Sequence, residues 1–464
     1  MALGKRRAKQ QELLVPTTSL PRSPGHPFYA KLNELLADAK FDRHVESLCE
    51  PHYKEGGRPS IPPGVYFRML LVGYFEGVDS QRGIAWRCSD SRSLQDFLGL
   101  LPTERTPDHS SLTVIRKRLP VEVHEEVFAF VVKIAKSKGM VKGKSLAVDT
   151  TTLEANAAMK SIVRRDTGKG WSDYVRELAK EEGIEDPTEE DLRRFDRKRR
   201  GKKVSNKDWQ SPSDPDSRIA RMKDGRTHLA YKAQHALDTD SEIIISATIH
   251  HADTADSETL KDGIIEAEAV LVSAEHDNPY EEVVADKGYH KTETLAWLKD
   301  RGIRSYIPQP RSQRKRKWTD KPESWQEAYR ANRRRVAGSR SKALQRLRSE
   351  RVERSFAHTC RSGAARRTWL RGVENVKKRY VIHVAARNLG TIMRSLFGVG
   401  TPRSMRRGLG GLLEAGFVIR GLIRSRIGHC YVTIVGFFRV GARSHRCEAL
   451  FLSRLQITAS STAC

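Results

Sequence analysis

The order of short apolar runs between residues 144 and 308 constrains the fold of this chain more than any other feature. Each run has the length and the apolar or β-branched composition of a strand: residues 145–148, 229–238, 242–250, 283–285 and 304–308. The turn-forming sequence Asp-Thr-Asp-Ser joins the second run to the third and predicts a hairpin. Helices are predicted at residues 257–273 and 292–301. The resulting order of strand, hairpin, helix, strand, helix and strand indicates an α/β domain.

A helical region of different character precedes this pattern. After a polar leader at residues 1–27, we expect a separate small domain at residues 28–140. One helix is predicted to open at the pair Pro62-Pro63 and to end near Gly77. Shorter helices follow: residues 80–88, residues 91–98 and a helix that Asp108 would cap. This succession is typical of a helix-turn-helix-like DNA-binding module, and the alternative is a helical bundle that only supports the next domain.

The second domain is expected at residues 141–400 and contains a long charged insert at about residues 160–227. The insert has few apolar residues, so we expect a DNA-facing or partly mobile subdomain, in which Asp214 and Asp216 form turns. A long amphipathic helix is predicted after residue 374. Residues 401–464 form an Arg-rich tail, which is either a DNA-binding or multimerising appendage or an extension outside the second domain.

The charge of the chain indicates a polyanionic partner. The sequence contains 84 Lys and Arg residues against 57 Asp and Glu residues, a formal net charge of +27. DNA fits this charge better than a membrane, because no uninterrupted apolar stretch is long enough to span a bilayer. The six cysteines contain no CxxC pair, which argues against a zinc ribbon or a disulfide framework. We expect a cytoplasmic protein, because the N-terminus lacks the apolar run of a secretory signal.

Three acidic residues carry the predicted chemistry. Asp149 and Asp286 each follow a predicted buried strand, and Glu353 lies in a helical segment that would pack on the sheet. Carboxylates at the ends of adjacent strands repel one another unless cations compensate. Two Mg²⁺ or Mn²⁺ ions, held roughly 4 Å apart by such oxygen ligands, would activate the attacking oxygen in a displacement at phosphorus. Each acid taken singly is explained as a turn, cap or ion-pair residue, and only the set favours a catalytic site.

Basic residues gather in two places. Residues 311–354 contain 16 Lys and Arg residues and five acids, interleaved with Trp and Tyr, a pattern typical of a surface that contacts phosphates. The predicted helix after Asp108 ends in three consecutive basic residues. The candidate DNA-binding residues come from these two segments: Arg116, Lys117, Arg118, Arg314, Lys315, Arg316, Lys317, Arg346, Arg348 and Arg354.

Three segments resemble the signature blocks of bacterial insertion-sequence DDE transposases. They are Ala-Val-Asp-Thr-Thr around Asp149, Ala-Asp-Lys-Gly-Tyr around Asp286 and Val-Glu-Arg-Ser-Phe-Ala-His around Glu353. Residues 224–232 and 366–372 are similar to stretches of the branch with a long insert after its first Asp, and the resemblance covers about residues 35–401. It implies an α/β fold, a ribonuclease-H-like mixed sheet flanked by helices, preceded by an all-α helix-turn-helix-like domain. It also implies that the three acids are a catalytic, metal-binding triad.

The same resemblance implies DNA transposition, in which a homo-oligomer on double-stranded DNA holds two element ends. The enzyme would hydrolyse a phosphodiester at each end and transfer the freed strand into target DNA, in the nucleoid of a bacterial cytoplasm. Two alternatives stay open: a metal-dependent nuclease without strand transfer, and a catalytically inactive, sequence-specific DNA-binding protein. The chain also departs from many relatives, which place Tyr, Arg and Lys where it has Arg346, Ser349 and Cys360. The auxiliary basic role would pass to Arg346, Arg348, Arg351 or Arg354.

Overall fold

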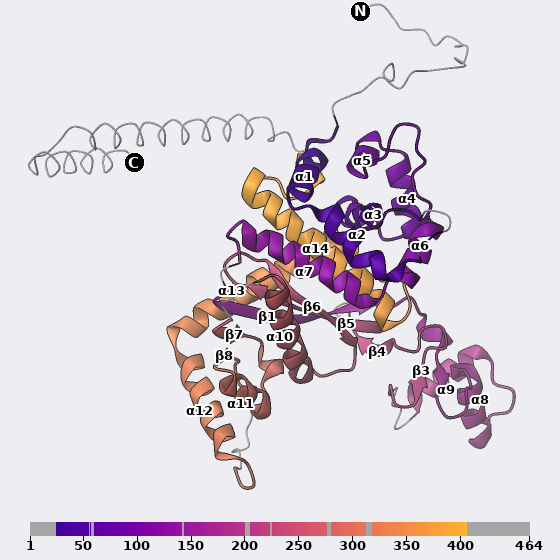
Figure 1. Ribbon diagram of the computed structural model, residues 1–464. Coiled ribbons are helices and arrows are strands. Elements are labelled where there is room, and N and C mark those ends of the chain that lie inside the picture. Colours follow the sequence, from indigo (N-terminus) through magenta and orange to yellow (C-terminus); the bar gives the residue numbers. More distant parts are fainter. Residues whose placement is uncertain are drawn as a thin grey trace, which may run out of the picture. The chain divides into compact units, whose positions relative to one another are not determined.

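The computed structural model describes residues 25–405 apart from a few short gaps (Figure 1). The gaps are residues 55, 57–59, 142, 200–204, 223–224, 276–279 and 312–317. The described residues from 25 to 404 form one compact unit. No helix in the described part of the chain is long and apolar enough to cross a membrane.

Seven α-helices among the described residues before residue 140 confirm the predicted helical region. They are α1 (Pro27–Asp38), α2 (Phe41–Cys49), α3 (Pro63–Glu76), α4 (Gln81–Ser89), α5 (Arg92–Phe97), α6 (His109–Arg118) and α7 (Val121–Ser137). Their ends follow local chemistry. Ser80 and Asp108 accept hydrogen bonds from the backbone N–H groups of Gly83 and Ser110, at the starts of α4 and α6. Gly77, at φ 69°, ends α3 in the left-handed conformation that glycine adopts without strain.

A mixed sheet follows the helices. Its strands are β1 (Ser145–Glu154), β4 (Arg218–Arg221), β5 (Thr227–Asp238), β6 (Ile244–His251), β7 (Glu282–Val284) and β8 (Arg304–Tyr306). The order is β4-β5-β1-β7-β8, with β6 also paired to β5. Strands β5 and β6 form the predicted antiparallel hairpin, whereas β1, β7 and β8 run parallel. The predicted α/β fold with a mixed sheet is confirmed.

The predicted end of the first strand is wrong. Strand β1 continues through Asp149 to Glu154, and each of these residues pairs with one of β5. The continuation contains Thr150, Thr151 and Thr152, whose β-branched side chains suit an extended backbone. Asp149 therefore lies within a strand and not at its end.

Helices cover the sheet and tie it to the N-terminal helices. These are α10 (Asp256–Ser273), α11 (Thr292–Asp300), α12 (Glu323–Ala337), α13 (Ser339–Phe356) and α14 (Val373–Phe397). A short helix, α15 (Pro402–Met405), closes the described chain. Helix α14 contacts β6, α3 and α7, and its middle two-thirds is almost entirely buried. The N-terminal helices thus pack directly on the helix that covers the sheet.

Two asparagines satisfy the backbone at opposite edges of the sheet. Asn388 of α14 accepts from Ile244 N (2.9 Å) and donates to Ile244 O (2.7 Å), beside the edge strand β6. Asn332 of α12 makes the same pair of bonds to Ile307, which follows the edge strand β8. All four bonds are buried, so the backbone N–H and C=O groups of Ile244 and Ile307 have partners where water is excluded.

The described part of the charged insert contains helices and strands of its own. Helices α8 (Trp171–Glu181) and α9 (Glu189–Lys198) enclose a small core of Val175, Ala179 and Leu192, next to the short paired strands β2 (Val163–Arg164) and β3 (Trp209–Gln210). After them, Asp214 accepts hydrogen bonds from Tyr231 Oη (2.7 Å) and Gly372 N (3.0 Å). Asp216 accepts from Val373 N (3.0 Å). The two aspartates hold the start of α14.

Candidate active site

Asp149 lies within β1, and Asp286 lies at the same level, just after the end of the neighbouring parallel strand β7. In the register of β1 and β7, Ala147 is opposite Val284, and each aspartate comes two residues later. Asp286 caps the short 3-10 turn η4 (Lys287–Tyr289) and accepts a hydrogen bond from Lys287 N at 2.6 Å. Burial raises the pKa of Asp149, and the negative charge of Asp286 raises it further. The two carboxylates are therefore close enough to repel each other.

Arg348 of α13 partly offsets this repulsion. Its Nη1 lies 2.6 Å from Asp149 Oδ2, and this ion pair opposes the rise of the Asp149 pKa. Its Nε donates to Gln345 Oε1 at 3.0 Å. Gln345 in turn donates to the carbonyls of Ala285 (3.1 Å) and Tyr306 (2.8 Å), at the ends of β7 and β8. These contacts hold α13 against the carboxyl ends of β7 and β8, beside the two aspartates.

Glu353 lies on the same helix but is exposed. It follows Arg348 by five residues, which turns its side chain about 140° around the helix axis from that of Arg348. The face of α13 that packs inward carries buried Val352 and Ser355. Among the described residues, no group of three His, Cys, Asp or Glu side chains is arranged to hold a metal ion. The structure thus brings two of the three predicted acids together, with Arg348 beside them.

The face of the sheet around Asp149 also carries a buried histidine. His235 is paired with Asp149 across β1 and β5. Its ring nitrogens lie 2.9 Å from Ser355 Oγ and 2.8 Å from Tyr380 Oη, and burial holds its pKa well below the ordinary value. His235 is therefore a neutral, fully bonded residue that anchors α13 and α14.

Asp256 is a residue near the site that the sequence patterns did not single out. It is the first residue of α10 and accepts from Thr150 Oγ1 (3.0 Å) and Lys232 Nζ (2.8 Å). A Cβ atom on Gly288 would lie only 3.1 Å from Asp256 Oδ2. Asp256 therefore supports both β1 and the turn after Asp286, from the side opposite α13, because neighbouring strand residues point to opposite faces. Its only signal in the sequence was an acid at the start of a predicted helix.

The donor set fits a divalent cation in part. Asp149 and Asp286 offer hard carboxylate oxygens, and their mutual repulsion is what a bound cation would relieve. Asp149 Oδ2 is engaged by Arg348, so a cation that uses this oxygen would have to replace the guanidinium.

The candidate DNA-binding residues lie in several different environments. Lys117 and Arg346 are exposed, and Arg118 is exposed while stacking on the Tyr53 ring at 4.6 Å. Arg354 is engaged with Glu242 and Glu350. Arg116 differs from its neighbours, because its Nε and Nη1 atoms are buried. The predicted residues Arg314, Lys315, Arg316 and Lys317 lie outside the described residues.

Comparison with protein families gives two matches. A model described as a transposase domain (DUF772) matches residues 19–118, which include α1 to α6. A model described as a transposase DDE domain matches residues 205–389, which include Asp286 and Glu353 but begin after Asp149. Searches of curated proteins and of solved structures gave no match.

A helical region of one transposase family, followed by a DDE domain on a mixed sheet, defines the class of protein: an enzyme that acts on DNA. The chain is a DDE transposase of the insertion-sequence type, its core has the ribonuclease-H-like fold, and DNA transposition is its function. DDE transposases generally use divalent metal ions.

Proposed function

We propose that Asp149, Asp286 and Glu353 form the catalytic triad and bind two Mg²⁺ or Mn²⁺ ions. The observation that carries this proposal is the placement of Asp149, within β1, next to Asp286, two residues after the parallel strand β7, in a chain that contains a DDE domain. Such ions would activate the attacking oxygen and stabilise the leaving oxygen at phosphorus. The protein then hydrolyses the phosphodiester at an element end and transfers the freed strand into target DNA.

The residues around the aspartates have separate roles in this proposal. Arg348 pairs with Asp149 in the form without metal, and Gln345 holds α13 at the carboxyl ends of β7 and β8. Glu353 lies on the same helix as Arg348, so Arg348 must leave Asp149 and α13 must move before Glu353 reaches the aspartates. The exposed basic residues Lys117 and Arg346 contact DNA phosphates.

The triad is tested by Asp149→Asn, Asp286→Asn and Glu353→Gln in an assay that separates intact, cut and joined DNA. Each variant is expected to lose at least about 1000-fold in cleavage while it still retards DNA, because only the metal ligands change. EDTA should abolish cleavage by the unaltered protein. Glu350→Gln is the matched control, because Glu350 is exposed on the same helix, and it should retain cleavage.

The outcomes of this assay separate the candidate functions. Joined products in Mg²⁺ or Mn²⁺ identify strand transfer, cut products alone identify a nuclease, and a retarded but intact duplex identifies a DNA-binding protein without activity. If a triad variant cleaves as well as Glu350→Gln, the residue that it replaces does not belong to the catalytic site. In particular, an active Glu353→Gln variant would mean that α13 does not supply the third carboxylate.

We further propose that a homo-oligomer holds two element ends together and acts on DNA in the nucleoid. A single subunit has one pair of juxtaposed aspartates, whereas an element has two ends to process. Light scattering on the purified complex with end DNA should give at least two protein chains for each pair of ends. A complex with one chain for each pair would contradict this proposal.

A further inference from the structure

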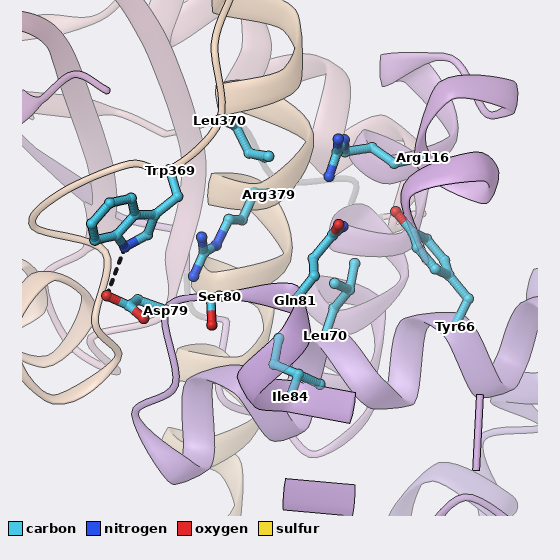
Figure 2. Close-up of a pocket in the computed structure, with 10 residues that line it drawn as sticks. All are labelled: Tyr66, Leu70, Asp79, Ser80, Gln81, Ile84, Arg116, Trp369, Leu370 and Arg379. Carbon is cyan, nitrogen blue, oxygen red and sulfur yellow. Dashed lines mark hydrogen bonds between the residues drawn. The ribbon is translucent and has the colours of Figure 1, made fainter. Parts of the chain in front are cut away.

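A cavity of about 170 Å³ lies between the N-terminal helices and the segment that leads into α14. It is shown in Figure 2, and none of its residues belongs to the candidate active site. The lining residues come from α3, α4, α6, α14 and the loops beside them: Tyr66, Leu70, Asp79, Ser80, Gln81, Ile84, Arg116, Trp369, Leu370 and Arg379. The cavity thus contains two arginines and one acid on a largely apolar wall.

The two arginines that line the cavity have donor atoms without hydrogen-bond partners in the protein wall. Arg116 Nε and Nη1 and Arg379 Nη2 are buried, and they have no hydrogen-bond partner among the described residues. Burial lowers the pKa of Arg379 to about 10 and also lowers that of Arg116. The charge of Arg116 contributes to the shift of Arg379, so the two guanidinium groups repel each other. A buried cationic donor without an acceptor is strongly unfavourable.

The polar side chains beside these arginines form other hydrogen bonds and do not accept from the three unpaired nitrogen atoms. Asp79 favours the charged form of Arg379, but its Oδ2 accepts a hydrogen bond from Trp369 Nε1 at 2.7 Å. Gln81 Oε1 accepts a hydrogen bond from Thr113 Oγ1 at 2.7 Å. Figure 2 shows Arg116, Gln81 and Tyr66 converging at one end of the cavity, while Arg379 lies toward Asp79 and Trp369. The cavity wall thus has two cationic side chains and a single carboxylate.

We propose that this cavity binds an oxyanion of the phosphate class, with Arg116 and Arg379 as its principal donors. A tetrahedral oxyanion offers several acceptor oxygens and the negative charge that two guanidinium groups require. Its source is either a phosphate group of bound DNA or free inorganic phosphate. Exposed Lys117 and Arg118 follow Arg116 directly, so a DNA backbone at this surface would bring phosphates to the cavity. The bound anion would join α6 to α14, and thereby the helical region to the helix that covers the sheet.

The site is tested by thermal unfolding of the full chain in inorganic phosphate, against sodium chloride of equal ionic strength. Phosphate is expected to raise the Tm by about 2 °C or more beyond chloride. Arg379→Gln and Arg116→Gln should each lose this increment. Both variants should remain folded without phosphate, because each removes an uncompensated buried charge. Arg82→Gln is the matched control, because Arg82 is an exposed cation of α4 next to Gln81, and it should keep the full increment.

Two results would overturn the proposal. One is an increment in the unaltered protein no larger than that in chloride. The other is an equal increment in Arg82→Gln and in both cavity variants, which would assign the effect to the net charge of the surface.

Duplex binding distinguishes the two sources of the anion. If a DNA phosphate occupies the cavity, Arg379→Gln should weaken duplex binding about tenfold, and inorganic phosphate should compete with the duplex more strongly than chloride does. If free phosphate is the ligand, the duplex should bind Arg379→Gln and the unaltered protein equally, and should leave the thermal effect of phosphate unchanged.

Discussion

At the level of single residues, burial and the ion pair with Arg348 act in opposite directions on Asp149. Its guanidinium lies 2.6 Å from Asp149 Oδ2 and opposes the burial that raises the pKa of that carboxyl. Burial is the larger influence, because the net direction of the pKa shift is upward. In the metal-free site the charged form of Asp149 is therefore less favourable than it is in the unfolded chain.

The raised pKa of Asp149 predicts a pH-dependent stability. Between the ordinary aspartate pKa of 3.8 and the raised value, the folded protein binds more protons than the unfolded chain. The contribution of Asp149 to stability is therefore largest at low pH and is lost as the pH rises through this window. Without metal, Asp149→Asn should have a higher Tm than the unaltered protein at pH 7, and the difference should vanish below the ordinary aspartate pKa.

The matched control for this experiment is Asp300→Asn, which alters an exposed aspartate at the end of α11. It should follow the unaltered protein at every pH. A lower Tm of Asp149→Asn than of the unaltered protein at pH 7 would show that the ion pair with Arg348 outweighs burial.

At the level of elements, the middle of α14 is tied to the edge strand β6 by one side chain. Asn388 makes two buried hydrogen bonds to the backbone of Ile244. Asn388→Ala would leave a buried N–H and a buried C=O without partners, which should lower the free energy of unfolding by about 2–4 kcal/mol. Urea denaturation measures this change.

Asn375→Ala provides the comparison on the same helix. Asn375 lies in the first turn of α14 and makes a single exposed hydrogen bond to Arg371 O. Its replacement should change the free energy of unfolding by less than about 0.5 kcal/mol. Equal effects of the two substitutions would mean that water satisfies the backbone of Ile244 in the variant.

For the whole molecule, the net charge of +27 governs the encounter with DNA. Binding that replaces counterions on DNA phosphates weakens as salt rises. Between about 50 and 200 mM NaCl, the affinity for a duplex should fall at least about 100-fold, as for a protein that contacts four or more phosphates. Fluorescence anisotropy measures this dependence. An affinity that does not change with salt would show that the basic surface does not bind DNA through phosphate contacts.

The local elements of this fold could be predicted from the sequence because their signals lie within a few residues. Ser80 and Asp108 were recognised as starts of helices and do accept the capping hydrogen bonds. Gly77 was recognised as the end of α3. The hairpin of β5 and β6 followed from two β-rich runs and the turn sequence between them. The length of β1 did not follow, because its extension through Thr150 depends on pairing with β5, a strand about 80 residues later in the chain.

The sequence by itself determined the order of the elements and the basic charge, and it predicted a site of three acids, of which Asp149 and Asp286 lie at the same level of β1 and of the segment after β7. Tertiary structure alone decided that Arg348 faces Asp149, that Asn388 satisfies the backbone of β6, and that Arg116 and Arg379 line one cavity. The physical reason is that caps, turns and periodicity arise from neighbours along the chain. Ion pairs, buried hydrogen bonds and cavities depend on which distant segments pack together. The residue pattern of one segment does not predict which other segment it will contact.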